Sequence, residues 1–173
     1  MAIRRILVPV DFSPASLQVL DFAIEFGKPF GAQLTVLFVV EPAYYAAVAD
    51  LDGTSANLSV LLESQRRSAT AQLVRLERRL KRRRAELHMC LQTGRAYSEI
   101  VEEAKRSKSD LIIMATHGRG GLSHLLMGSV AERVVRSAPC PVLTLRRVPP
   151  RARGRRSSRA RPAAGAAPSR HAA

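Results

Sequence analysis

The chain has 173 residues, of which 46% are hydrophobic and 24% charged, and its formal net charge is +14. This length fits one domain with a single core, and no apolar run approaches the roughly 20 residues that a membrane-spanning helix needs. The hydrophobic run before Asp11 is too short for a signal peptide. We therefore expect a cytoplasmic protein with no membrane partner.

The positive charge is unevenly distributed. Nine of the 28 basic residues, and none of the 14 acidic ones, lie between Arg146 and Ala173. This C-terminal stretch is rich in Arg, Ala, Pro, Gly and Ser and lacks apolar periodicity, which predicts a disordered basic tail over 149–173 after a domain over 1–148. A second basic stretch runs from Arg66 to Arg84.

The two cysteines, Cys90 and Cys140, are too few and too far apart for a disulfide framework. No paired CxxC or HxxxH spacing indicates a metal site. We expect both to be buried structural thiols.

The first part of the chain predicts a strand, a helix and a second strand. Ile6–Val10 is a short apolar run typical of a buried strand. Ser13 offers an N-cap, Pro14 fits the first helical position, and Gly27 ends the helix. Leu34–Val40 is apolar on both faces, as expected of a parallel strand covered by helices on two sides.

The rest of the chain continues the alternation, after an irregular segment expected over 41–62. The predicted elements are a helix from about Ser64, a strand over 87–91, a helix over 96–107, and strands over 111–115 and 142–145. The first of these helices has one apolar face, formed by Ala69, Leu73, Leu76 and Leu80. The order predicts an open, Rossmann-like α/β fold, a five-stranded parallel sheet with helices on both faces.

Four glycines stand in the segment Ala115–Ser129, which reads ATHGRGGLSHLLMGS and separates the strand over 111–115 from a further helix. Ser129 and Glu132 have the S-x-x-E spacing of a capping box, so this helix is expected to begin near Gly128 and Ser129. Free N–H groups at a helix start attract anions. Asp11, which leaves the first strand, offers a carboxylate to a ribose, a base or a metal, or alternatively caps the first helix.

Three motifs together resemble the universal stress protein family over roughly residues 3 to 147: ILVPVDFS, MATHGRGGLSHLLMGSVAERVV and PCPVLTL. The resemblance implies the strand order 3-2-1-4-5, which places Asp11 and the glycine segment at one crevice. ATP-binding members carry the motif G-x2-G-x9-G-[ST]. Gly118, Gly128 and Ser129 match it, whereas Ala115 replaces the first glycine. That methyl group is tolerated if the φ angle of residue 115 is negative, and crowds the nucleotide if close backbone approach requires glycine.

The resemblance also implies the residues of a nucleotide site. Those that would frame the base and ribose are Pro9, Asp11, Val39 and Met114, and those that would wrap the phosphates are Gly118, Gly128, Ser129 and Val130, with Ala115 at the start of the motif. Val39 and Met114 are equally explained as core residues of apolar strands. His117 and Arg119 either reach a phosphate or lie in solvent.

Three functions remain open. In the first, the chain is a stress-responsive regulator that binds ATP or a related nucleotide, with or without Mg²⁺. It is then at most a slow ATPase, because no GK[ST] motif is present and only Asp11 offers a base. In the second, Ala115 has abolished nucleotide binding and the chain is a dimeric interaction module, since family members often pair through the fifth strand, here Pro141 to Leu145. In the third, the Arg-rich tail tethers the protein to nucleic acid or another polyanion, without sequence selectivity.

Overall fold

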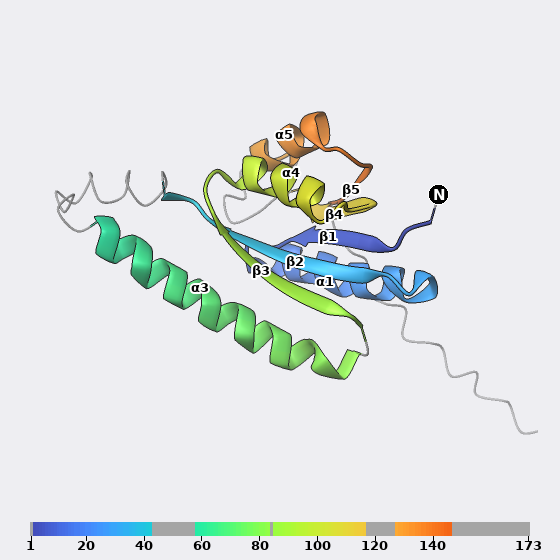
Figure 1. The fold of residues 1–173 in the computed structure, drawn as a ribbon, viewed down its shortest axis with the longest axis horizontal. Coiled ribbons are helices and arrows are strands. Elements are labelled where there is room, and N and C mark those ends of the chain that lie inside the picture. The colour runs from blue at the N-terminus through green and yellow to red at the C-terminus, as the bar shows by residue number, and fades with distance from the viewer. Residues whose placement is uncertain (1, 43–57, 84, 117–126, 147–173) are drawn as a thin grey trace, which may run out of the picture.

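Five parallel strands form one sheet in the order β3-β2-β1-β4-β5 (Figure 1). The computed structural model describes residues 2–42, 58–83, 85–116 and 127–146. The strands are β1 (Arg5–Pro9), β2 (Gln33–Val40), β3 (Leu87–Thr93), β4 (Leu111–Ala115) and β5 (Val142–Leu145). The predicted fold class and strand order are confirmed, whereas the predicted tail over 149–173 lies outside the described residues.

The helices follow the predicted positions with one clear exception. They are α1 (Pro14–Gly27), η1 (Lys28–Phe30), α3 (Leu58–Leu80), η3 (Lys81–Arg83), α4 (Ala96–Arg106) and α5 (Ser129–Ser137). Helix α3 begins at Leu58 rather than near Ser64, so the prediction of irregular structure is wrong for residues 58–62. Residues 43–57 lie outside the described part of the chain. None of the described helices combines the length and the apolar character that crossing a bilayer requires.

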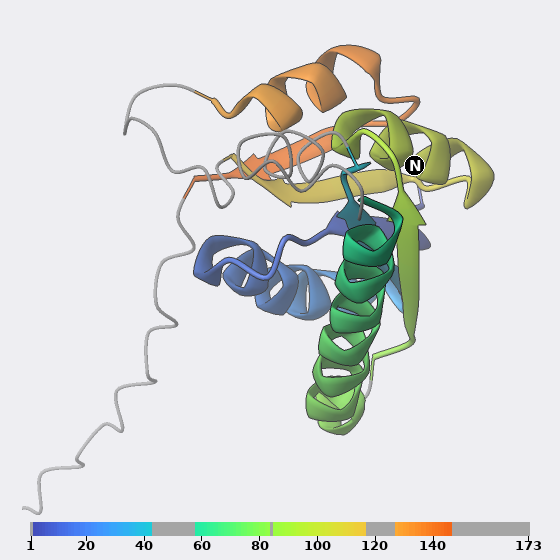
Figure 2. The same ribbon diagram turned by 90° about the vertical axis from the view of Figure 1, so that its left-hand side faces the viewer.

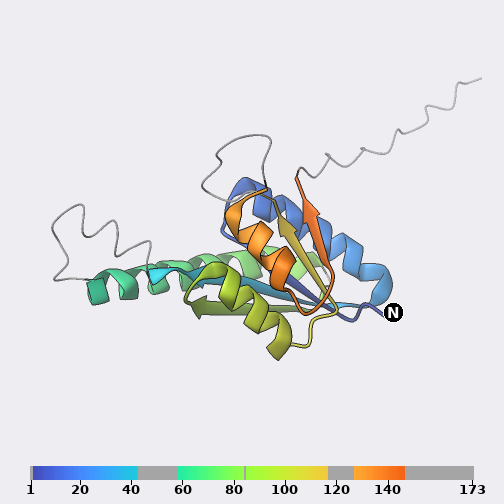
Figure 3. The ribbon, with the colours of Figure 1, turned by 90° about the horizontal axis from the view of Figure 1, so that it is seen from above.

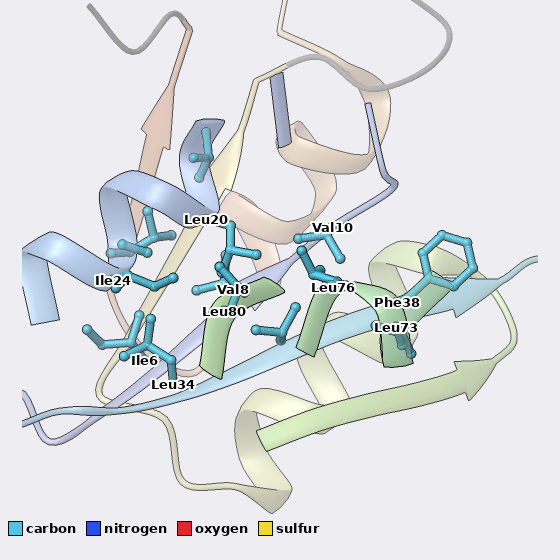
Figure 4. Close-up of a cluster of buried hydrophobic side chains, with 14 of the residues drawn as sticks. Ile6, Val8, Val10, Leu20, Ile24, Leu34, Phe38, Leu73, Leu76 and Leu80 are labelled. Carbon is cyan, nitrogen blue, oxygen red and sulfur yellow. The ribbon is translucent and has the colours of Figure 1, made fainter. Parts of the chain in front are cut away.

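The helices cover both faces of the sheet, α1 and α3 on one and α4 and α5 on the other (Figures 2 and 4). Successive strand residues point to opposite faces, so Ile6 and Val8 pack under α1 and α3 while Leu7 packs under α4 and α5. Both faces of the central strands are therefore buried. This explains why β1 and β2 are continuous apolar runs rather than alternating ones.

The start of α1 matches its sequence signals. The hydroxyl of Ser13 accepts a hydrogen bond from the Ser16 N–H at 3.2 Å, and Pro14 occupies the first helical position. Leu20 and Ile24 of this helix are 0% exposed. Burying a side chain of this size contributes about 1.5–3 kcal/mol, so these two residues fix α1 on the sheet.

The Asp110 side chain links the amino ends of β1 and β4 through hydrogen bonds. Its Oδ2 accepts hydrogen bonds from the N–H groups of Arg4 and Arg5, each at 2.9 Å. These two bonds lower the pKa of the Asp110 carboxyl below its usual 3.8. The opposite, carboxyl edge of the sheet is the edge at which ligands bind in open α/β folds.

The two cysteines lie at opposite sides of the sheet, Cys90 on β3 and Cys140 just before β5. Both are free thiols and half-buried, so the expectation of full burial is wrong. Burial raises the pKa of both thiols, and the carboxylate of Glu103 raises that of Cys90 further. Both groups are therefore weaker nucleophiles than an exposed cysteine.

Candidate functional site

The carboxyl edge of the sheet brings two sequence-distant segments to one end of the fold. β1 pairs with both β2 and β4, so the ends of β1 and β4 are neighbours. Asp11 follows β1, and α5 begins beyond β4, at the same edge of the sheet (Figure 3). The predicted proximity of the Asp11 segment and the start of α5 thus agrees with the strand order.

A tight turn after β1 carries Asp11. The Asp11 Oδ1 accepts a hydrogen bond from the Ser13 N–H at 3.0 Å, and the Asp11 N–H donates to the Ser16 hydroxyl at 3.3 Å. Ser13, and not Asp11, is the N-cap of α1, so the alternative that Asp11 caps this helix is wrong. The carboxylate instead stabilises the turn that leads into α1, through its hydrogen bond with the Ser13 N–H.

Phe12, inside this turn, has a φ angle of 60°. This left-handed conformation is unfavourable for a bulky residue and occurs only where the surroundings enforce it. Here the Phe12 ring packs on Phe38 of β2 with 4.7 Å between ring centroids. Nothing in the sequence marks this position, because an aromatic residue gives no signal for positive φ.

Helix α5 begins one residue earlier than the predicted capping box requires. Gly128 is the N-cap, with φ −61° and ψ 148°, and Ser129 is already helical, so the prediction that Ser129 caps the helix is wrong. The Gly128 N–H donates to the Thr116 carbonyl at 2.8 Å, which holds Gly128 outside the helix. Glu132 forms an ion pair with Arg136 at 2.9 Å. Its spacing from Ser129 therefore reflects no capping box.

Within residues 2–42, 58–83, 85–116 and 127–146, no side chain caps the start of α5. The first N–H groups of a helix have no acceptor within it and carry the positive end of the helix dipole. The start of α4 differs, because Glu41 Oε1 accepts a hydrogen bond from the Ala96 N–H at 2.6 Å. Of these two helix starts, α4 already holds a carboxylate of the chain, whereas α5 is suited to an external anion.

The predicted phosphate-binding residues are only partly brought together. Ser129 and Val130 stand in the first turn of α5, where their N–H groups face the end of the helix. The Gly128 N–H already donates a hydrogen bond to the Thr116 carbonyl, so this amide is not a phosphate donor in the structure. Gly118, His117 and Arg119 lie outside the described residues.

Two of the predicted base-framing residues, Val39 and Met114, form one apolar wall with Val130, which was predicted to wrap the phosphates. Met114 is buried between the sheet and the α4–α5 pair, and Val39 and Val130 pack partly buried against the same cluster. Pro9 ends β1, half-buried and paired with Leu37. The alternative that Met114 is simply a core residue agrees with its burial.

Two residues that the sequence did not single out join this wall. Tyr97, in the first turn of α4, packs against the same cluster. The guanidinium of Arg133 on α5 lies 5.1 Å from the centre of the Tyr97 ring, a cation–π contact that links the two helices near their starts. The two side chains come from separate segments, and their sequence spacing predicts no contact.

Ala115 adopts ordinary strand geometry. It ends β4, pairs with Leu145, and packs its methyl group on the face covered by α1 and α3, whereas Met114 faces α4 and α5. Among the described non-glycine residues, positive φ occurs at Phe12 and Lys108, so the φ of Ala115 is negative. The backbone at this position therefore does not require glycine, and the methyl group points away from the Met114 side of the sheet.

The described ranges hold no group of three or more His, Cys, Asp or Glu side chains placed to bind a metal ion. Asp11, just beyond the carboxyl end of β1, offers an oxygen of the class of ligands that Mg²⁺ prefers.

The comparisons with known proteins agree with this architecture. A model of the universal stress protein family matches residues 2–146. A universal stress protein of Methanocaldococcus jannaschii is 33% identical over 144 residues, which cover 83% of this chain and 82% of the relative. The solved structure of a universal stress protein from Lactobacillus plantarum is 28% identical, with a TM-score of 0.72 over 84% of this chain and 99% of that chain.

Two more distant structures contain nucleotides. A universal stress protein in complex with cAMP is 23% identical, with a TM-score of 0.59 over 84% of this chain and 98% of that chain. A universal stress protein from Archaeoglobus fulgidus in complex with dAMP is 21% identical, with a TM-score of 0.57 over 83% of this chain and 98% of that chain. At these identities the likeness is one of fold.

Proposed function

Because this chain belongs to the universal stress protein family, we propose that it is a stress-responsive regulator that binds ATP or a related nucleotide at the carboxyl edge of its sheet. The observation that carries the proposal is the start of α5, which no side chain of the described residues caps, at the edge of the sheet where Asp11 follows β1. The nucleotide complexes of two relatives with the same fold support it.

Each part of the edge has a role in this proposal. The N–H groups at the start of α5 hold a phosphate, since they carry partial positive charge and need acceptors. The wall of Val39, Met114 and Val130 takes the apolar face of the base. Asp11 accepts a hydrogen bond from the ribose or base, or contributes an oxygen to a Mg²⁺ ion carried by the phosphates. Ala115 does not oppose the proposal, because its methyl group packs on the other face.

The nucleotide acts here as a regulatory ligand. Asp11 is the only residue we name as a base for a slow hydrolysis, and its Oδ1 already accepts a hydrogen bond from Ser13. That bond holds the carboxylate in a fixed position, which suits Asp11 to orienting a ligand.

Calorimetric titration of nucleotide-free protein with ATP at physiological salt tests the proposal. We expect saturable binding, weakened at least tenfold by Asp11→Asn. Asp21→Asn removes the same charge from the α3 side of α1, where Asp21 pairs with Arg83, and should leave affinity within twofold. No saturable binding up to millimolar ATP rejects nucleotide sensing. Equal affinity in wild type and the Asp11→Asn variant rejects the site.

The edge strand β5 supports a second proposal, that the chain pairs with another copy of itself. Among the described strands β5 pairs with β4 alone, and all four of its residues are half-buried. The carbonyls of Pro141 and Leu145 face β4, so by strand alternation the backbone of Val142 and Thr144 faces outward. Unpaired groups on an edge strand can accept a further strand.

Thr144→Pro tests this second proposal. It removes an outward N–H while sparing the β4–β5 ladder, since proline is tolerated on the outer side of an edge strand. We expect light scattering to show a dimer for wild type and a monomer for this variant. A monomeric wild type, or a variant that stays dimeric, contradicts pairing through β5.

A further inference from the structure

Helix α3 and η3 present a row of arginines on the side turned away from the sheet. The row, called the arginine stripe below, consists of Arg75, Arg78, Arg79 and Arg82. All four are exposed, and their spacing of i, i+3, i+4 and i+7 places them on one helix face. The opposite face is buried against the sheet through Ala69, Leu73, Leu76 and Leu80. In Figures 1 and 2, no described element covers the outer side of α3.

The arginine stripe differs from its basic neighbours, because those neighbours form ion pairs and the stripe forms none with the residues that the structure describes. Arg67 pairs with Glu63 at 3.1 Å, and Arg83 pairs with Asp21 at 3.0 Å and with Glu25 at 3.5 Å. Within the described ranges, by contrast, no ion pair or hydrogen bond holds any guanidinium of the stripe. Glu77 is the one acidic residue between Ser64 and Ala85 in the sequence, and it forms no ion pair with them.

This arrangement is unfavourable for the isolated chain. Like charges three and four residues apart on a helix repel one another. The helix dipole compensates cations only in the last turn, which covers Arg78 and Arg79 but not Arg75. An external polyanion laid along the stripe removes the repulsion.

We propose that the arginine stripe binds the phosphate backbone of duplex nucleic acid without base specificity. The four residues extend over about 10 Å of helix axis, and one DNA strand carries about three phosphates over that length. Guanidinium groups suit this ligand because they donate two parallel hydrogen bonds to one phosphate.

Other polyanions fit the surface less well. A bilayer is bound by helices that insert an apolar face, whereas Leu73, Leu76 and Leu80 are buried in the core. Single-stranded nucleic acid is held by stacking of bases on aromatic side chains, and Leu58–Arg83 contains none. The double-stranded backbone needs neither feature.

Fluorescence anisotropy with a labelled DNA duplex, using the full chain, tests the proposal. The test variant carries Arg75→Gln, Arg78→Gln, Arg79→Gln and Arg82→Gln. The control removes the same charge from the other face of the sheet, through Lys105→Gln, Arg106→Gln, Lys108→Gln and Arg136→Gln. All four control positions are exposed. Both variants keep residues 149–173, so the basic tail contributes equally.

We expect the stripe variant to bind at least tenfold more weakly at 0.1 M salt, and the control to stay within threefold of wild type. The slope of log affinity against log salt should fall by about 3 in the stripe variant, since about three phosphate contacts are lost and each contributes about 0.9. A second variant with lysine at the four positions keeps the charge and should retain most of the slope. It provides the comparison if the glutamine variant fails to fold.

Equal losses in the stripe and control variants, or none in either, overturn the proposal, because they assign binding to overall charge or to the tail. Tighter binding to phosphatidylserine vesicles than to duplex DNA, lost in the stripe variant, overturns the choice of partner. The Asp11→Asn variant should bind DNA as wild type does, so failure of the nucleotide proposal and failure of this one are distinguishable.

Discussion

Gly128→Asp should stabilise the fold and destroy nucleotide binding at the same time. Gly128 is the N-cap of α5 and already has the extended φ and ψ of a capping residue, so aspartate requires no backbone change. Replacing a glycine cap by aspartate gains a few tenths of a kcal/mol, and a carboxylate at a helix N-terminus adds about 0.3–1 kcal/mol. The sum is about 0.5–1 kcal/mol. For a chain of this size it corresponds to a rise in Tm of about 1–4 °C.

The same carboxylate competes with the ligand. It would accept hydrogen bonds from the N–H groups of Val130 or Ala131 and repel a phosphate brought to the helix start. We therefore expect the affinity for ATP to fall at least tenfold, a loss of about 1.4 kcal/mol or more in binding free energy.

Differential scanning fluorimetry and calorimetric titration measure the two effects on one preparation. Gly128→Asn is the matched control, because its neutral side chain caps the helix without the repulsion and should lower affinity less than aspartate does. An aspartate variant that binds ATP as tightly as wild type would refute the placement of the phosphate. A lower Tm would refute our account of the uncapped helix.

Three further outcomes follow from the fold. The Asp110→Asn variant should be about 1 kcal/mol less stable than wild type near pH 6. Folding lowers the Asp110 pKa, so the extra stability of wild type is present above pH 3.8 and is lost as the pH falls through the folded-state pKa. Urea unfolding of both proteins at several pH values measures this difference. Cys90 and Cys140 should react with Ellman's reagent at pH 7.5 at least tenfold more slowly in the folded than in the urea-unfolded protein, because burial raises their pKa values. Fast labelling of the folded chain would contradict these raised pKa values. Leu20→Ala should cost about 2–5 kcal/mol in urea unfolding, against less than about 0.5 kcal/mol for Val74→Ala, which is 39% exposed.

The elements with strong local signals were predicted from the sequence to within a residue. Ser13 and Pro14 mark the start of α1, and the apolar runs over 111–115 and 142–145 have the observed bounds of β4 and β5. The start of α3 was missed because its first turns do not repeat the apolar period of the packed part. Val60 is 65% exposed there, so burial does not dictate the pattern.

The candidate site was harder to predict, because its details depend on contacts between distant segments. The S-x-x-E spacing of Ser129 and Glu132 is correct for a capping box, yet the Thr116 carbonyl holds Gly128 and shifts the helix start by one residue. The positive φ of Phe12 likewise depends on Phe38, twenty-six residues away in the sequence. Such tertiary constraints leave no periodic trace in the sequence.

The hydrogen bond from the Gly128 N–H to the Thr116 carbonyl joins the end of β4 to the N-cap of α5. Main-chain atoms form this bond, so every substitution at the two positions except proline at 128 keeps its donor and acceptor. The start of α5 therefore stays tied to the edge of the sheet while the side chains at both positions vary.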